Sequence, residues 1–179
     1  MMRWLSSSRS VVLVLAALAA LLAVAAGLLW FSSARDEMRL SGEPMTDAQA
    51  ASQVVASARQ IVSAAQLRDA TAGYTFVSCQ NATEPPYQVT VYMNFRLPQD
   101  NSVKYLSDVA ASMVAHGWTP APVMGEHFGH KLTKDGVTAT FYRDSNTEFA
   151  TMRLYGECRN TGDHRNDNPA WTEVTDQLG

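Results

Sequence analysis

The sequence predicts an α+β protein in which an N-terminal transmembrane helix precedes a two-layer domain with two helices and a mainly antiparallel sheet. Three observations lead to this prediction. A long apolar run lies near the N-terminus, two later segments have helical apolar spacing, and five have strand-like composition. Their order after the run is α-β-β-α-β-β-β. Consecutive strands favour hairpins, so we expect both helices on the buried face of an antiparallel sheet.

The apolar run covers residues 11–31 and follows Arg3 and Arg9. At about 1.5 Å per helical residue, its 21 residues match a hydrocarbon core of roughly 30 Å. The apolar part of a secretory signal peptide is shorter, about 7 to 15 residues. We therefore expect an uncleaved signal anchor, although Ala23-Val24-Ala25 offers a cleavage pattern and leaves a cleaved signal as the alternative.

The charges around this run predict its orientation and the organisation of the chain. Arg3 and Arg9 precede the run, so the positive-inside rule places the N-terminus in the cytoplasm and the remainder outside the cell membrane. Residues 32–45 are polar and carry Gly42 and Pro44, as expected of a linker. The predicted organisation is a cytoplasmic N-terminus over 1–10, a span over 11–31, a linker over 32–45, an extracytoplasmic domain over 46–160 and a polar tail with a short helix over 161–179.

The composition of the exported part restricts its partners. Residues 36–179 contain 11 Lys and Arg against 17 Asp and Glu, which gives a formal charge of −6. This acidic balance argues against binding to nucleic acid and against electrostatic binding to anionic lipid. The segment is long enough for one domain with a hydrophobic core.

Two segments of the exported part are predicted to be helices. Thr46-Asp47-Ala48-Gln49 fits a capping box, and the apolar residues that follow recur with helical spacing as far as Leu67. A second helix begins at the Asp100-Asn101-Ser102 group and ends before Gly117, a natural residue after a helix C-cap. Its predicted apolar stripe consists of Val103, Leu106, Val109, Ala110, Met113 and Val114.

The remaining regular segments are predicted strands. The clearest follows Pro86, where Val89, Val91, Met93, Phe95 and Leu97 alternate with polar residues, so one face is buried and the other wet. The wet face, made of Gln88, Thr90, Tyr92, Asn94 and Arg96, is either solvated or a recognition surface. Residues 129–134 and 137–143 flank Lys134-Asp135-Gly136, and Asp-Gly is a strong hairpin signal. The last strand covers 148–158, and Asn168-Pro169 favours a short final helix.

Both cysteines, Cys79 and Cys158, lie in the exported part at the ends of strand-like segments. Outside the cytoplasm a disulfide bond is the expected state, with two buried free thiols as the alternative. A bond would require Cα atoms within about 7 Å of each other. The first and last predicted strands must then end close together.

No motif of the sequence predicts catalysis, a metal or a cofactor. His127 and His130 are the nearest approach to a metal pair, but a spacing of three on a strand places them on opposite faces. We therefore expect solvated loop residues there. Nucleophile elbows, phosphate loops and zinc-protease motifs do not occur in the sequence.

Several stretches resemble the LppA-like lipoproteins of mycobacteria, over roughly residues 50–160 and including both cysteines. They are Ser78-Cys79-Gln80-Asn81 with Pro85-Pro86-Tyr87, Met113-Val114-Ala115-His116-Gly117-Trp118, Leu132-Thr133-Lys134-Asp135-Gly136-Val137-Thr138 and Leu154-Tyr155-Gly156-Glu157-Cys158-Arg159. The resemblance implies an envelope-exposed domain and no catalytic residue. Members of that family carry a lipidated cysteine after the apolar segment, whereas this chain has none before Cys79, so a protein span is expected in its place.

The function expected from these observations is a membrane-tethered, extracytoplasmic binding or accessory module of the cell envelope. Its partner would be an envelope protein or another envelope molecule, including a lipid. Two alternatives remain open: a hydrolase whose active site is assembled from distant residues, and a carrier of apolar lipids in a cavity between helices and sheet.

Overall fold

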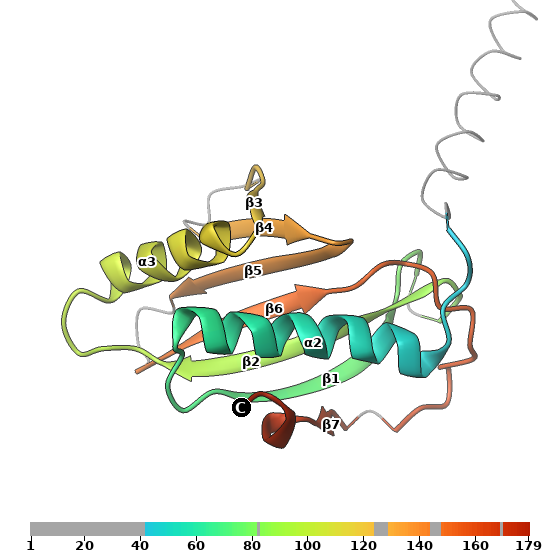
Figure 1. The fold of residues 1–179 in the computed structure, drawn as a ribbon. Helices are drawn as coiled ribbons and strands as arrows, with labels where there is room; N and C mark the ends of the chain where they lie inside the picture. Colours follow the sequence, from blue (N-terminus) through green and yellow to red (C-terminus); the bar gives the residue numbers. More distant parts are fainter. Residues whose placement is uncertain (1–41, 82, 124–128, 144–147, 169) are drawn as a thin grey trace, which may run out of the picture. The chain divides into compact units, whose positions relative to one another are not determined.

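The computed structural model describes residues 42–81, 83–123, 129–143, 148–168 and 170–179 (Figure 1). The predicted span over 11–31 lies outside these ranges, and within them no helix is both long and apolar enough to cross a membrane. The predicted fold class is corrected accordingly. The described part is an α+β domain with two α-helices and seven strands rather than five.

The strands form one sheet in the order β3-β4-β5-β6-β2-β1-β7, with every neighbouring pair antiparallel. The antiparallel pairing expected from the hairpins is therefore present. The strands are β1 (Thr71–Ser78), β2 (Tyr87–Arg96), β3 (Thr119–Pro120), β4 (His130–Lys134), β5 (Val137–Arg143), β6 (Phe149–Tyr155) and β7 (Thr172–Glu173).

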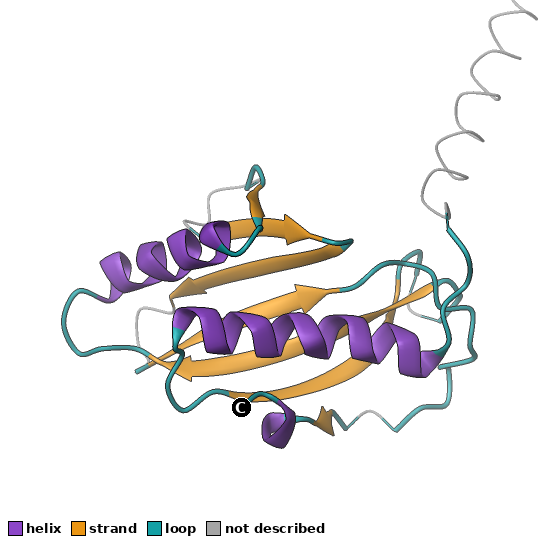
Figure 2. Ribbon diagram, in the orientation of Figure 1, coloured by secondary structure: helices purple, strands orange, loops and turns teal. Residues whose placement is uncertain are grey.

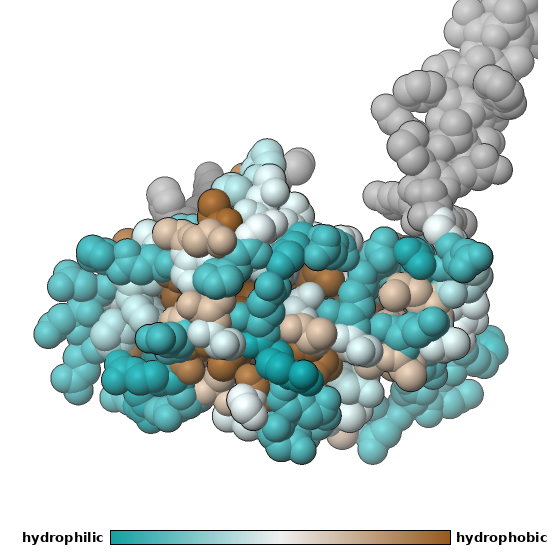
Figure 3. All heavy atoms as spheres, in the orientation of Figure 1, coloured by the Kyte–Doolittle hydropathy of each residue, from teal (hydrophilic) through white to brown (hydrophobic). Residues whose placement is uncertain are grey.

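Both helices lie on the same side of the sheet (Figures 1 and 2). Helix α2 (Asp47–Ala65) packs mainly on β2, and α3 (Ser102–Ala115) packs against α2, β4 and β5. Seen from the helical side, the surface is mostly hydrophilic with small apolar areas (Figure 3). The main core therefore lies between the helices and one face of the sheet.

The start of α2 follows the predicted capping box. The backbone N–H of Gln49 donates to Thr46 Oγ1 at 3.3 Å, and the backbone N–H of Thr46 donates to Gln49 Oε1 at 2.8 Å. These bonds satisfy amide groups that have no partner within the helix. The buried stripe of the helix consists of Ala50, Val54, Val55, Ala58 and Ile61.

The apolar face of α3 is narrower than the sequence predicts. Leu106, Val109 and Met113 are buried, whereas Val103 and Val114 are 69% and 45% exposed. The helix turns about 100° per residue, so the two exposed valines fall beside the stripe that meets the sheet. The predicted end is confirmed, because Gly117 has a left-handed φ of 90° just beyond the helix.

The alternation predicted for β2 is confirmed except at Thr90, which was expected on the wet face but is only 2% exposed. Val89, Val91, Met93 and Phe95 are completely buried beneath the helices. On the other face Tyr92 is partly exposed and Asn94 is exposed. The predicted hairpin is also present, because Asp135 and Gly136 both have positive φ and join β4 to β5 as a two-residue turn.

Two strands and the last helical turn depart from the prediction. Strands β3 and β7 have two residues each, too few to show a periodic pattern. The predicted helix after Asn168 is replaced by β7 and a short 3₁₀ helix, η1 (Thr175–Gln177). The backbone of β7 pairs with the free edge of β1, and this tertiary contact overrides the local helical spacing.

The predicted disulfide bond between Cys79 and Cys158 is formed, with the Cα atoms 6.1 Å apart. The sheet topology explains this proximity. Strands β1 and β6 both pair antiparallel with β2, so they run in the same direction. Their last residues therefore lie at the same end of the sheet, beside the beginning of β2. Each cysteine follows one of these ends, and the bond links the two strands across the beginning of β2.

Asn160, which is completely buried, fastens the segment after Cys158 to the rest of the domain. Its backbone exchanges two hydrogen bonds with Tyr87, at 2.7 and 3.1 Å. Its side-chain amide donates to the Met45 carbonyl and to Asp47, and its Oδ1 lies 2.9 Å from His164 Nε2. The beginning of α2, the beginning of β2 and the C-terminal segment therefore share one polar contact point.

Replacing either cysteine by serine, Cys79→Ser or Cys158→Ser, is expected to lower the free energy of unfolding by about 2 to 5 kcal/mol, because the unfolded chain loses a constraint. Urea denaturation followed by circular dichroism measures the change. The double variant should resemble the single ones, since either change removes the same bond. If alkylation of the denatured, unreduced protein labels both cysteines, the bond is not present in the protein.

The C-terminal segment should contribute to stability through Leu178, which is only 3% exposed. The Leu178→Ala variant is expected to lose about 2 to 5 kcal/mol of unfolding free energy because a buried side chain is truncated. The control is Val103→Ala, also an apolar truncation but at a 69% exposed position, with an expected change within about 0.5 kcal/mol. Equal changes in the two variants would show that the segment is not packed.

Candidate functional site

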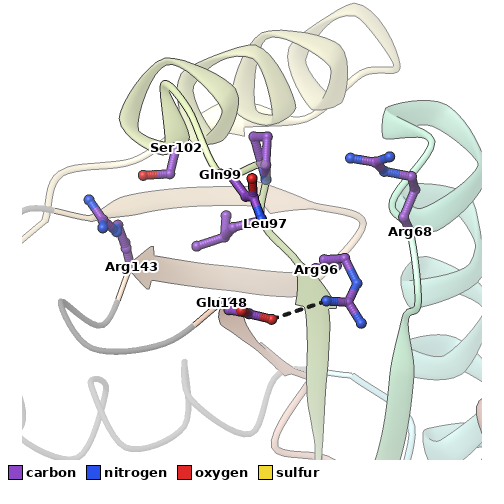
Figure 4. Close-up of a pocket in the computed structure, with 8 residues that line it drawn as sticks. Arg68, Arg96, Leu97, Gln99, Ser102, Arg143 and Glu148 are labelled. Carbon is purple, nitrogen blue, oxygen red and sulfur yellow. Dashed lines mark hydrogen bonds and ion pairs between the residues drawn. The ribbon is translucent and has the colours of Figure 1, made fainter.

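A cavity of about 370 Å³ lies at the end of the sheet where strand β2 finishes and the chain turns into α3 (Figure 4). Its lining comes from four separate parts of the chain: the α2–β1 connection, the end of β2 with the β2–α3 connection and the start of α3, the end of β5 and the residue before β6. The lining residues are Arg68, Arg96, Leu97, Pro98, Gln99, Ser102, Arg143 and Glu148.

Backbone hydrogen bonds hold three of these parts together. The N–H of Arg96 donates to the carbonyl of Arg68 at 2.9 Å, and the N–H of Leu97 donates to the carbonyl of Glu148 at 2.7 Å. Arg68 and Glu148 therefore lie on opposite sides of the end of β2. Backbone hydrogen bonds of the sheet thus continue past the start of β1 and the start of β6, and they fix the positions of the residues that line the cavity.

Arg96 is already neutralised by its surroundings. Its guanidinium pairs with the carboxylate of Asp69 and, at 3.2 Å, with that of Glu148. The hydrogen bond that Arg96 donates to Asp69, together with the negative charge of that carboxylate, raises the pKa of Arg96 above its ordinary value. The side chain also lies 4.9 Å from the centre of the Phe149 ring. Arg96 therefore links Asp69, which precedes β1, to Glu148, which precedes β6.

Arg68 and Arg143 differ from Arg96 because neither has an ion-pair partner among the residues that the structure describes. Both are exposed, and Figure 4 shows them on opposite sides of the cavity. Arg68 also acts on Tyr105, whose pKa is raised by burial and lowered in part by the positive charge of Arg68. Two arginines with no ion-pair partner in the described part of the chain thus line the same cavity.

Ser102 supplies a polar group at the wall of the cavity. The residue is only 9% exposed, and its hydroxyl has no hydrogen-bond partner among the described residues. It is the first residue of α3, whose N-cap residue, Asn101, makes no side-chain cap bond and whose first turn contains no acidic residue. The positive end of the helix dipole therefore adds to the two free arginines.

This combination is suited to binding an anion. Guanidinium groups present planar sets of N–H donors that match carboxylate and phosphate oxygens. A serine hydroxyl and uncapped helix amides donate to the same kind of group. Glu148 would oppose an anion, and it shares the single positive charge of Arg96 with Asp69. Three arginines, Arg68, Arg96 and Arg143, against these two carboxylates still leave a net charge of 3 − 2 = +1 around the cavity. The cavity can thus hold an anionic group without further rearrangement of charges.

Of the two histidines singled out from the sequence, the structure describes only His130. His127 lies outside the described residues. His130 lies in β4, where its ring stacks on Phe141 with the ring centres 5.1 Å apart, so it is a strand residue and not a solvated loop residue. No group of three or more metal-binding side chains is found in the described part of the chain.

The side chain of His164 is almost completely buried, with 5% of it exposed. Its Nδ1 lies 2.7 Å from Asp167 Oδ2, and its Nε2 lies 2.9 Å from Asn160 Oδ1. The ring also stacks on Phe76, with the ring centres 3.8 Å apart. Both ring nitrogens are occupied by acceptors, so this histidine holds the C-terminal segment in place.

Most of the cavity was not predictable from the sequence. Arg96 belongs to the predicted wet face of β2, but Arg68, Ser102, Arg143 and Glu148 are far apart in the chain and follow no motif spacing. A weak signal was available in the cluster of polar residues that precedes the second helix. This cluster, Asp100-Asn101-Ser102, predicts the start of a helix, but it does not predict that Arg68 and Arg143 line a cavity with Ser102.

Comparison with known proteins agrees with the resemblance to mycobacterial lipoproteins. The family model described as "Putative lipoprotein LppJ" matches residues 46–177. The chain belongs to the LppJ family. Proteins of that description from two strains of Mycobacterium tuberculosis and from Mycobacterium bovis are 45% identical to it over 139 residues, which is 77% of this chain and 73% of each relative. No solved structure matches.

Burial of His130 generates a prediction about pH. Burial lowers its pKa below the ordinary value near 6.5, so its imidazole should titrate at lower pH in the folded protein than in the urea-denatured chain. NMR titration of the imidazole protons measures both values. Because unfolding then takes up a proton, the free energy of unfolding should fall as the pH drops below about 6.5. The His130→Gln variant should lose this part of the pH dependence, and an unchanged dependence would contradict the assignment.

Proposed function

We propose that this LppJ-family chain is a membrane-associated, extracytoplasmic accessory protein of the cell envelope that binds an anionic group of an envelope molecule in the arginine-lined cavity. The relatives are described as lipoproteins, which supports association with a membrane. The disulfide bond supports a position outside the cytoplasm, because such bonds persist in oxidising compartments.

The observation that carries the proposal is the pair of arginines, Arg68 and Arg143, that lack acidic partners among the described residues and face one cavity. The acidic balance of the exported part makes this local excess of positive charge more informative. Two unpaired arginines beside a buried hydroxyl and a helix N-terminus form a specific place for negative charge. Phosphate and carboxylate groups both meet this requirement.

The test measures binding of inorganic phosphate to the full-length protein in a non-ionic detergent by isothermal titration calorimetry. Arg143→Gln and Arg68→Gln are each expected to weaken binding about tenfold, since each removes a charge-assisted hydrogen bond. The control is Arg165→Gln, which makes the same change in charge at an exposed arginine that pairs with Asp163. Its affinity should equal that of the unmodified protein.

Citrate and phosphatidylglycerol vesicles extend the same titration to a carboxylate and to a lipid phosphate, with phosphatidylcholine vesicles for comparison. Preference for phosphatidylglycerol would identify a lipid head group as the source of the anion. Binding should weaken as salt is added, because the arginines are exposed. Absence of saturable binding to all the anions, or equal affinities for Arg143→Gln and Arg165→Gln, would refute the proposal.

A further inference from the structure

The opposite face of the sheet carries a second arrangement of side chains, and it is independent of the arginine-lined cavity. Both α-helices lie on the other side, so this face is not covered by them (Figure 2). At its centre Tyr92 of β2 is directly opposite Arg153 of β6 and Gly73 of β1. The register therefore creates a row across three strands, with a glycine in the third place.

Trp171 occupies the space that Gly73 leaves free. A Cβ atom at position 73 would lie 3.0 Å from the Cβ of Trp171 and 3.2 Å from the carbonyl oxygen of Thr172. The indole packs edge to face against Tyr92, with the ring centres 4.4 Å apart. Strand β7, which follows at once, holds this position by pairing with Gly73 and Tyr74. The tryptophan is placed by the sheet but remains 42% exposed.

The other side of the row restrains Tyr92. The guanidinium of Arg153 lies over the tyrosine ring, 4.5 Å from its centre. A cation over the face of one ring and an indole against the same ring limit its motion. Tyr92 and Trp171 are therefore an ordered aromatic pair at the surface.

A cavity of about 510 Å³ lies beside this pair, and its other walls are mainly polar. Its lining residues are Thr71, Ala72, Gly73, Tyr92, Asn94, Trp171 and Glu173. Asn94 Oδ1 accepts a hydrogen bond from the Thr151 hydroxyl at 2.9 Å, which directs its acceptor to the sheet and leaves its NH₂ group for another partner. The carboxylate of Glu173 accepts from Thr175.

We infer that this cavity is a binding subsite for a neutral saccharide. A sugar ring has an apolar C–H face that packs on an indole and hydroxyl groups at its edge that bond to amides, hydroxyls and carboxylates. The cavity offers these two kinds of surface side by side. Glu173 disfavours an anion there, and the polar walls disfavour an acyl chain. The inference does not depend on the anion site.

The experiment applies the full-length protein to an array of immobilised neutral hexose and pentose oligosaccharides, in a polyoxyethylene detergent that has no sugar head group. The unmodified protein should be retained by members of the array. Trp171→Ala should reduce the apparent affinity about tenfold or more, and Trp171→Phe should retain part of it because a ring remains. Gly73→Ala should also reduce retention, because its methyl group would crowd the Trp171 Cβ and the Thr172 backbone and shift the tryptophan.

The matched control is Tyr142→Ala, because Tyr142 is an aromatic residue of β5 that is also 42% exposed but does not line the cavity. Its retention should equal that of the unmodified protein. Thermal unfolding checks that Trp171→Ala is folded, and phosphate titration of the same variant checks the arginine-lined cavity separately. No retention of the unmodified protein, or equal retention of Trp171→Ala and Tyr142→Ala, would overturn the inference.

Discussion

The pairing of β2 on both of its edges is the constraint on which the rest of the domain depends. The strand contributes Val89, Val91, Met93 and Phe95 to the core, all completely buried, and it pairs with β1 on one side and β6 on the other. Because both neighbours are antiparallel to β2, their ends meet at its beginning. This geometry allows Cys79 and Cys158 to bond across the strand.

Successive side chains of β2 point to opposite faces of the sheet, so one face of the strand belongs to the core and the other can line the two cavities. Its even-numbered residues project away from the helices, and among them Tyr92 and Asn94 line the cavity beside Trp171 while Arg96 lines the arginine-rich cavity at the strand end. One short run of polar residues therefore contributes to both proposed sites. The apolar residues between them hold this run in place, since a shift of register by one residue would expose the buried set.

Several elements follow from local patterns, and the reason is that the relevant interactions are short in sequence. The capping box at Thr46 and Gln49 and the Asp135-Gly136 turn involve residues at most three apart. The alternation in β2 reflects the two-residue period of a strand. By contrast, β3, β7 and the short helix η1 depend on pairing or packing with distant segments, so their own residues gave either no pattern or a misleading one.

The sequence by itself determined the α+β composition of the domain, the positions of its helices and main strands, and the presence of two cysteines suited to an oxidising compartment. Only the tertiary structure decided the number of strands, the contact point at Asn160, and which polar residues share a cavity. Arg68, Ser102 and Arg143 line one cavity because the α2–β1 connection, the start of α3 and the end of β5 lie at the same end of the sheet. Trp171 reaches Tyr92 because Gly73 leaves room above β1. Such meetings depend on strand order and register, which local residue spacing does not encode.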